Sequence, residues 1–427
     1  MAKMSETTRR QLLSWIDKDK HTLVDFFSGF VKAKSPNPPG DTRVAVDYLC
    51  KFLSNKDIAY KIIAPQPTMP NIVSTFAGSG PGRHLVLNGH IDVFPAGDGA
   101  GWKRAPWSGE VAEGFIWGRG SADMKGGTAA SFITYAYLHR IRGELNGKLT
   151  LTAVSDEETG GKWGTRYLLE NHADECLGDC VLNGEPSSPQ TVRFGEKGAL
   201  RVALKVTTPG AHGAYAHRSA SATKIAACVI KDLEKLTELK PDMPEEVRRV
   251  LARPEVQAAT EQGLGTGASA YIPKVVVNVG VIRGGLKVNM MPGECVMELD
   301  IRIPIGLDQK RVRAALADVL KAYPEVGMSV TEAHCYEPSW CDPNGEMLEI
   351  IQSNAHVVTG VVPQPITTLA GTDCRYWRHR GVPAYVYGPS PGNMGAKDER
   401  VSIEEFLGVV GTHVLSAYDY LRRPAPS

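Results

Sequence analysis

Four short segments of this chain share one pattern: an acidic or imidazole side chain lies in or beside a glycine-containing turn. In three of the four, the turn directly follows a strand-like apolar run, as His90 and Asp92 follow Leu85-Val86-Leu87. An open α/β sheet presents its ligands at this position, outside the carboxyl ends of its strands. The four segments are residues 88–95, 118–127, 156–160 and 183–186.

Strand-like and helical runs alternate along the first part of the chain. This alternation predicts an α/β fold with a mostly parallel sheet and helices on both faces. We expect Asp41 to cap the second helix of this part. The expected strands are 58–63, 71–76, 84–88, 148–154 and 180–182, and the expected helices are 6–33, 41 to about 53, and those that begin at 126 and 164.

The pattern changes near Phe194 and returns after Pro343. Between them, strands at 199–207, 275–282, 295–303 and 329–333 and helices at 220–239 and from 308 predict a smaller α+β unit, with 241–273 as a surface insertion in it. After it we expect a helix at 346–358, a strand at 384–387 and a helix at 402–422. We therefore predict one domain formed by 1–194 and 341–427, with a second domain, 195–340, inserted into it.

Composition excludes several classes of partner. A net charge of +1 over 427 residues gives no electrostatic case for nucleic acid or an anionic membrane. Residues 1–20 are polar and mixed in charge, unlike a secretory signal, and no apolar run approaches the roughly 18 residues that span a bilayer. The eight cysteines lack paired CxxC spacing and are typical of reduced thiols, so we expect a cytoplasmic protein.

His90 and Asp123 each have two interpretations. His90 could bind a metal through one ring nitrogen while Asp92 holds the other, or it could be a strand-end histidine with an unrelated acidic neighbour. Asp123 could be a ligand, or it could cap the helix that begins near Gly126.

The adjacent carboxylates Glu157 and Glu158 are more informative, because they repel each other unless a cation lies near or water screens them. They form either a solvated acidic turn or a metal ligand beside a general base that takes a proton from water. Glu185 repeats the strand-end placement. Together the four segments favour a divalent metal site over four unrelated turns.

In this order the segments resemble family M20 of metallopeptidases and amidohydrolases, over nearly the whole chain from Ser35-Pro36 to the last helix. The resemblance implies that His90, Asp123 and Glu185 hold one divalent transition metal ion, such as Zn, Mn or Co. It also implies that Asp123 bridges to a second ion bound by Glu158, and that Glu157 is the general base.

The resemblance makes 195–340 a lid and dimerisation domain, so it implies a homodimer or higher homo-oligomer. Within 210–217, His212 matches a histidine that reaches across the dimer to polarise the scissile carbonyl. Asn289, Arg302 and Arg375 resemble substrate-binding positions. Lys197 could add a cation there, or it could be a solvated lysine of a turn.

One segment departs from the family pattern. The family ends its site with His-x-x-(Asn/Asp)-Glu, which supplies the last ligand of the second ion. Here the segment reads Gly-Ala-Lys-Asp-Glu, so Gly395 stands where the histidine is expected. The second site loses its nitrogen donor, and we therefore predict one well-held ion per chain.

We expect a metal-dependent hydrolase that cleaves a C–N bond in a small carboxylate-bearing molecule, with an amide as the ordinary case. One alternative is hydrolytic deamination of an aromatic amine such as 5-nitroanthranilate, an activity also found in the family. Another is a non-catalytic binding or scaffold member, which Glu157 argues against because a base has little purpose without turnover.

Overall fold

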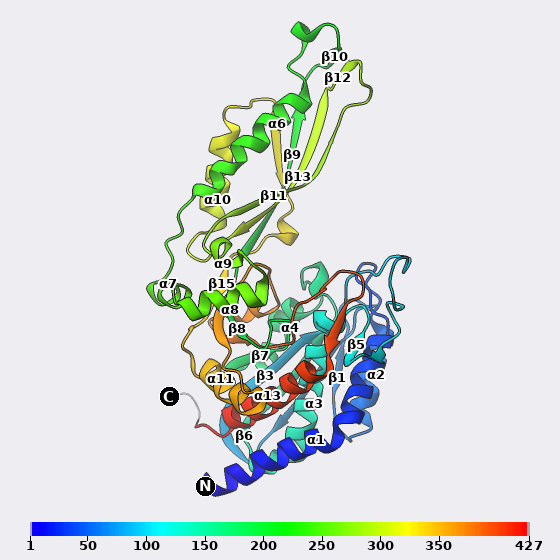
Figure 1. Ribbon diagram of the computed structural model, residues 1–427, viewed down its shortest axis with the longest axis vertical. Helices are drawn as coiled ribbons and strands as arrows, with labels where there is room; N and C mark the ends of the chain where they lie inside the picture. The colour runs from blue at the N-terminus through cyan, green and yellow to red at the C-terminus, as the bar shows by residue number, and fades with distance from the viewer. Residues whose placement is uncertain (1, 425–427) are drawn as a thin grey trace.

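The computed structural model describes residues 2–424 and shows a larger and a smaller body in one elongated molecule (Figure 1). Both ends of the described chain lie in the larger body, and the smaller body extends from it along the long axis. Among the described residues, no helix has the length and apolar character needed to cross a bilayer.

The larger body is built on a nine-stranded sheet. Its strands are β1 (Lys61–Ile63), β2 (Asn71–Ala77), β3 (Gly80–His90), β6 (Asn146–Val154), β7 (Cys180–Asn183), β8 (Thr191–Glu196), β15 (Ser339–Trp340), β16 (Gln364–Thr368) and β17 (Ala384–Val386). They follow the order β1-β2-β6-β3-β7-β17-β8-β15, with β16 paired to β8. The centre, β6-β3-β7-β17, is parallel. The predicted α/β fold with a mainly parallel central sheet is confirmed.

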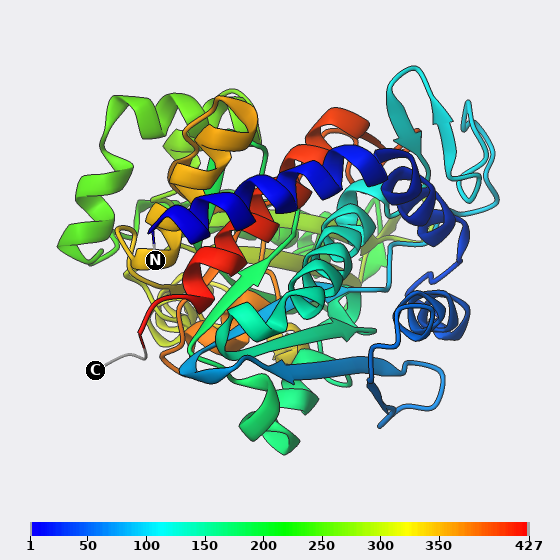
Figure 2. The same cartoon turned by 90° about the horizontal axis from the view of Figure 1, so that it is seen from below.

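Helices cover both faces of this sheet. One layer contains α1 (Ala2–Lys32), α2 (Arg43–Ser54), α3 (Gly126–Arg140), α11 (Glu346–Thr359) and α13 (Ile403–Leu421). The other contains α4 (Thr165–Asn171), α5 (Ala173–Cys176) and α12 (Cys374–Arg378). Figure 2 shows α1 lying across α13. Because both faces are covered, Leu85, Val86 and Leu87 of β3 are all fully buried, as a central parallel strand requires.

The smaller body is an antiparallel sheet with the order β11-β13-β9-β14, covered by two helices. Its elements are β9 (Gly198–Thr207), β11 (Val276–Gly284), β13 (Glu294–Ile303), β14 (Val326–Val330), α6 (Ala222–Leu233) and α10 (Gln309–Leu320). At its far end, β10 (Ala211–His212) pairs with β12 (Met290–Met291) to form a tip that points away from the larger body (Figure 1).

The segment 241–273 was expected as a surface insertion in the smaller unit, but it packs against the larger body. It forms α7 (Glu245–Leu251), α8 (Pro254–Leu264) and α9 (Ala268–Tyr271). Val247, Val250 and Val256 are buried in the core of the larger body, where α7 and α8 contact β16. The apolar spacing of these short helices is satisfied by the larger body. We therefore propose the predicted domain division, 1–194, 195–340 and 341–427, with one change: residues 241–273 belong to the larger body.

Several element boundaries also differ from the sequence-based ones. The helix expected at 220–239 ends at Leu233 and continues as a tighter turn, and the strand expected at 329–333 is β14, three residues earlier. Thr42, not Asp41, occupies the cap position before α2, and the Asp41 carboxylate accepts a hydrogen bond from Nε of Arg43 at 2.9 Å. Strands β8 and β16 were not expected, nor was the small sheet of β4 (Glu110–Ala112), β5 (Phe115–Trp117) and β18 (Arg400–Ser402).

Candidate active site

The site lies where the parallel strands of the larger sheet end. His90 is the last residue of β3, Glu185 follows β7, and Glu157 and Glu158 form a short helical turn, η3 (Glu157–Thr159), after β6. Because β3, β6 and β7 run parallel and adjacent, their carboxyl ends bring these side chains to one edge. Asp123 reaches the same edge from η1 (Ser121–Lys125), the turn that precedes α3.

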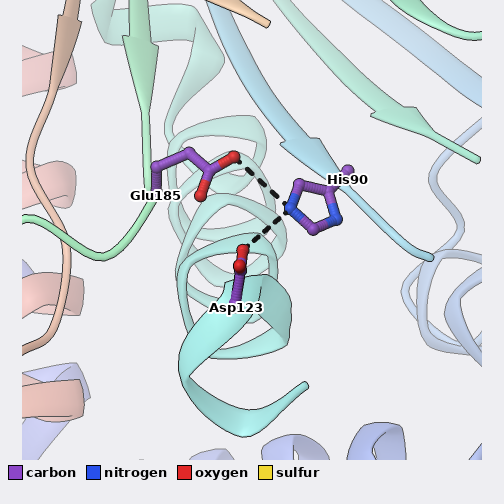
Figure 3. Close-up of side chains that lie close together, drawn as sticks. All are labelled: His90, Asp123 and Glu185. Carbon is purple, nitrogen blue, oxygen red and sulfur yellow. Dashed lines mark hydrogen bonds and ion pairs between the residues drawn. The ribbon is translucent and has the colours of Figure 1, made fainter. Parts of the chain in front are cut away.

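His90, Asp123 and Glu185 converge (Figure 3). The Nε2 atom of His90 lies 3.1 Å from an oxygen of Asp123 and 3.3 Å from an oxygen of Glu185. One donor atom from each of the three lies within 4.8 Å of the other two. One imidazole nitrogen and two carboxylates are a donor set that suits zinc and other divalent transition metals.

The electrostatics of this cluster also fit a cation. Burial raises the pKa of Glu185 to about 7, and burial likewise raises the pKa values of Glu157 and Glu158 well above their usual range. Burial lowers the pKa of His90, but the charge of Glu185 and contacts with both acids outweigh this and raise it well above normal. The protein alone therefore holds excess negative charge here, which a proton or a metal ion would neutralise.

Asp92 lies beside Nδ1 of His90, as expected, and contacts it mainly through its backbone. The Nδ1 atom of His90 donates to the backbone carbonyl of Asp92 at 2.8 Å, whereas the Asp92 carboxylate is 3.7 Å away. That buried carboxylate accepts hydrogen bonds from the backbone N–H groups of Glu157 and Glu158, at 3.2 and 3.1 Å, and from the side chain of Asn37 at 2.9 Å. Asp92 thus fixes the η3 turn and positions the two glutamates.

Glu157 and Glu158 have different surroundings. Nη1 of Arg375 lies 3.5 Å from a carboxylate oxygen of Glu157. Glu158 is not part of the cluster that His90, Asp123 and Glu185 form, and its Oε1 atom is buried without a hydrogen-bond partner. Such an orphaned carboxylate oxygen is uncommon in a folded protein and fits a ligand position for an added cation.

The segment 395–399 holds the site from outside. The buried carboxylate of Glu399 accepts from the backbone N–H groups of Ala122 and Asp123, at 3.0 and 3.1 Å, and from Nη1 of Arg119 at 2.6 Å. Glu399 therefore fixes the η1 turn that carries Asp123. The sequence shows the missing histidine at Gly395 in this segment, but it predicts no role for Glu399.

A cavity of about 490 Å³ opens onto this edge. Asp123, Glu157, Glu158 and Glu185 line it from the larger body, and Arg302 lines it from β13 of the smaller body. Arg375 also lines it, and its guanidinium lies between the rings of Tyr336 and Tyr376, 4.7 and 4.6 Å from their centroids. This packing holds the guanidinium in place.

Two of the expected substrate-binding residues, Lys197 and Asn289, and the expected catalytic residue His212 do not line the cavity. Nζ of Lys197 donates to the carbonyls of Tyr271 and Lys274, at 2.6 and 2.5 Å, so this buried lysine joins the turn between β8 and β9 to residues 271–274. It is therefore not a solvated lysine of a turn. His212 and Asn289 are exposed at the tip of the smaller body. Their predicted roles would need a second chain.

Sequence reasoning missed Arg193, a buried residue of β8 that lines the cavity. It was missed because β8 was not expected as a strand. The alternation of apolar and charged residues in Val192, Arg193 and Phe194 is typical of a strand and could have indicated this residue.

Comparison with known proteins identifies the family. The model of Peptidase family M20/M25/M40 matches residues 86–418, well over half of the chain, so the chain belongs to this family. A succinyl-diaminopimelate desuccinylase from Cereibacter sphaeroides is 28% identical over 360 residues, which cover 82% of this chain and 87% of that protein. One from Nautilia profundicola is 25% identical over 391 residues, 90% of this chain and 95% of that protein.

Solved structures with a similar fold include a member of the same family. An M20 family metallo-carboxypeptidase from Sulfolobus solfataricus superposes with a TM-score of 0.78 at 19% identity, covering 94% of this chain and 98% of that one. Family membership and these relatives make the chain a hydrolase that acts on amide or other C–N bonds. It is therefore an enzyme, and the non-catalytic alternative is set aside.

Proposed function

We propose that the enzyme hydrolyses an amide bond in a small carboxylate-bearing molecule. In this proposal His90, Asp123 and Glu185 hold a divalent ion and Glu157 is the general base. One observation carries it: the three donor atoms lie within 4.8 Å of one another, and Glu157 lines the same cavity without belonging to that cluster.

When bound, a divalent ion such as Zn, Mn or Co would act as a Lewis acid and lower the pKa of water at the site. Glu157 would accept the proton of the attacking water and return it to the leaving nitrogen. Its burial suits this task, because burial raises the pKa of the carboxyl well above its usual value and strengthens it as a base, while the charges of His90 and Arg375 oppose the rise only in part. Asp92 keeps the carboxyl in place through the backbone of η3.

Arg375 is the group best placed to bind a substrate carboxylate. A guanidinium presents a planar fork of donors that matches a carboxylate, and its stacking between Tyr336 and Tyr376 fixes the direction of that fork. Arg302 donates to the hydroxyl of Tyr336 at 3.1 Å and pairs with Asp300 at 3.0 Å. It would add positive charge from the smaller body.

We further propose one well-held ion per chain. Glu158 and Asp123 remain as oxygen donors for a second ion, but Gly395 supplies no side chain. Oxygen donors alone hold transition metals less firmly than a set that includes imidazole.

We propose that the active unit is at least a dimer, in which His212 reaches the partner's site and donates to the developing oxyanion. The exposed tip supports this, because Leu286 and Val288 beside it are almost fully exposed, at 91% and 101%. Exposed apolar groups of this kind mark protein–protein contacts.

Mixing inactive variants tests the dimer. His212→Ala should lose a hydrogen bond worth about 3 kcal/mol in the transition state. With Glu157→Gln it should form heterodimers that contain one intact site. Recovered activity is expected, whereas no recovery after demonstrated subunit exchange would contradict a role for His212 across the interface.

For partners and location we propose a small-molecule substrate, no nucleic acid or membrane partner, and the cytoplasm. Family membership supports a small-molecule substrate. The near-neutral net charge of +1 supports the absence of nucleic-acid and anionic-membrane partners, and eight free cysteines support the cytoplasm.

A substrate screen tests the activity. The metal-loaded protein would be assayed with N-acyl amino acids, dipeptides and 5-nitroanthranilate, with Glu157→Gln as the control. Release of an amino acid from an acylated substrate, abolished in the control, is expected. Turnover of the aromatic amine alone would replace the proposal with hydrolytic deamination, and turnover of none of these substrates would contradict it.

A further inference from the structure

Arg193 differs from two other buried arginines of the larger body, Arg375 and Arg378. Arg375 contacts Glu157 and donates to the carbonyl of Thr372 at 2.5 Å. Arg378 pairs with Glu196 at 3.1 Å and donates to the carbonyl of Ala384. Both guanidiniums thus have protein partners that offset the cost of burying their charge.

The guanidinium of Arg193 has no such partner. The residue is only 5% exposed, and its Nε atom is buried without a hydrogen bond. Among the described residues its side chain makes no hydrogen bond and no ion pair within 4.0 Å. Burying a charged group with five donors is costly unless something pairs with it. Since Arg193 lines the cavity, the missing partner can enter from there.

The nearby acids do not complete the pairing. Burial lowers the pKa of Arg193 to about 10, and the charges of Glu185 and Asp123 only partly oppose this. These two acids contact the imidazole of His90 instead. Arg193 therefore acts on the Glu185 side of the cavity, and Arg375 acts on the Glu157 side.

We propose that Arg193 is an anion subsite that receives a second carboxylate of the substrate, separate from the carboxylate assigned to Arg375. The substrate class is then a dicarboxylate amide. A planar carboxylate matches the donor fork of a guanidinium and supplies the two acceptors that the protein does not. This inference deepens the proposed function and rests on it, because the bound dicarboxylate is a substrate only if the enzyme hydrolyses amides.

Binding of plain dicarboxylates tests the subsite without turnover. Malonate, succinate and glutarate, each beside its monomethyl ester, would be titrated into the metal-loaded protein by calorimetry. The three lengths cover the unknown spacing between subsites. For at least one length we expect the diacid to bind about 10-fold or more tightly than its ester, because a charge-assisted pair is stronger than a neutral one.

Three variants assign that preference. Arg193→Met should reduce it to about 2-fold or less, and Arg193→Lys, which keeps the charge but loses the fork, should retain part of it. Arg166→Met is the matched control. Arg166 also lines the cavity, but its side chain is 55% exposed and already paired with Glu170 at 2.8 Å, so the preference should not change.

Three results would each overturn the subsite. The first is a wild-type protein that does not distinguish diacid from ester at any length. The second is an Arg193 variant that distinguishes them as the wild type does. The third is loss of the metal ion from Arg193→Met and Arg193→Lys alike, which would make Arg193 a support of the metal cluster. If Arg193→Met does not fold, the comparison of Arg193→Lys with the wild type decides. Failure of amide hydrolysis would appear in the substrate screen and leave these binding results intact.

Discussion

The site has two candidate metal-binding halves at the same edge of one sheet, and they differ in the donor atoms that they offer. In one half, His90 contacts Asp123 and Glu185 through a single ring nitrogen. In the other, Glu158 has an oxygen without a partner, and Gly395 offers no side chain where the family pattern has a histidine. The first half has a mixed nitrogen and oxygen donor set, and the second has oxygen alone.

The difference teaches that a segment can still support the site after it has lost the side chain that would bind metal. The 395–399 segment has no histidine, yet Glu399 still bonds the backbone of η1, and the carbonyl of Gly395 accepts from Nη2 of Arg119 at 3.0 Å. The turn that carries Asp123 is therefore held as the first half needs. On the proposal of one well-held ion, the second half is weak because one donor is missing, while the segment that should carry it is held in place.

The largest expected effect concerns Glu157, which lies in the cavity but in neither ligand set. Glu157→Gln keeps the size of the side chain and removes its basicity, so turnover should fall by about 100-fold or more. Bound metal, measured by elemental analysis, should not change. Near-normal turnover in this variant would remove Glu157 from the mechanism.

A smaller effect separates the two halves directly. His90→Asn should weaken metal affinity by more than about 100-fold, since even groups that only support a ligand are worth 10- to 100-fold. Glu158→Gln should weaken affinity for the well-held ion by less than about 10-fold, because it also removes like-charge repulsion. Competition with a fluorescent chelator measures both. Equal losses in the two variants would show that the halves hold the ion jointly.

The smallest expected effect is a pH dependence of stability. Burial raises the pKa of Glu185 from 4.5 to about 7 in the metal-free protein. A carboxyl with a raised pKa in the folded state contributes stability that is fully present below pH 4.5 and lost as pH rises through about 7. Urea unfolding of the metal-free protein should therefore show stability falling across this window.

Metal and a matched variant sharpen this test. Bound metal should remove the contribution of Glu185, and the decline that remains should diminish in Glu158→Gln, because burial raises the pKa of Glu158 as well. Metal-free Glu185→Gln should lose less stability across the same window than the metal-free wild type. An identical decline in that variant would show that other groups cause it.

Much of the site could be predicted because its chemistry lies at strand ends. His90, Glu157 and Glu185 each adjoin a turn that follows a predicted strand, and parallel strands bring such turns together. Asp123 lies in a glycine-containing turn before a helix. The sequence places Asp92 beside His90, but it does not show that the carboxylate of Asp92 also accepts from the backbone of η3.

Contacts between distant segments could not be predicted. Lys197 was read by its residue type, but its partners are the carbonyls of Tyr271 and Lys274, more than seventy residues away along the chain. The helices of 241–273 have apolar faces that would suit either body, and only the packing of Val247 and Val256 decides between them. Arg193 was not predicted because β8 was not expected as a strand and because the importance of Arg193 comes from having no partner.

The central claim is that only the His90 half holds an ion firmly. Its most direct test is the number of divalent ions per chain that remain after the purified protein, loaded with excess zinc or manganese, is dialysed extensively against metal-free buffer. Elemental analysis should find one ion per chain in the wild type and none in His90→Asn. Two retained ions per wild-type chain would contradict the account.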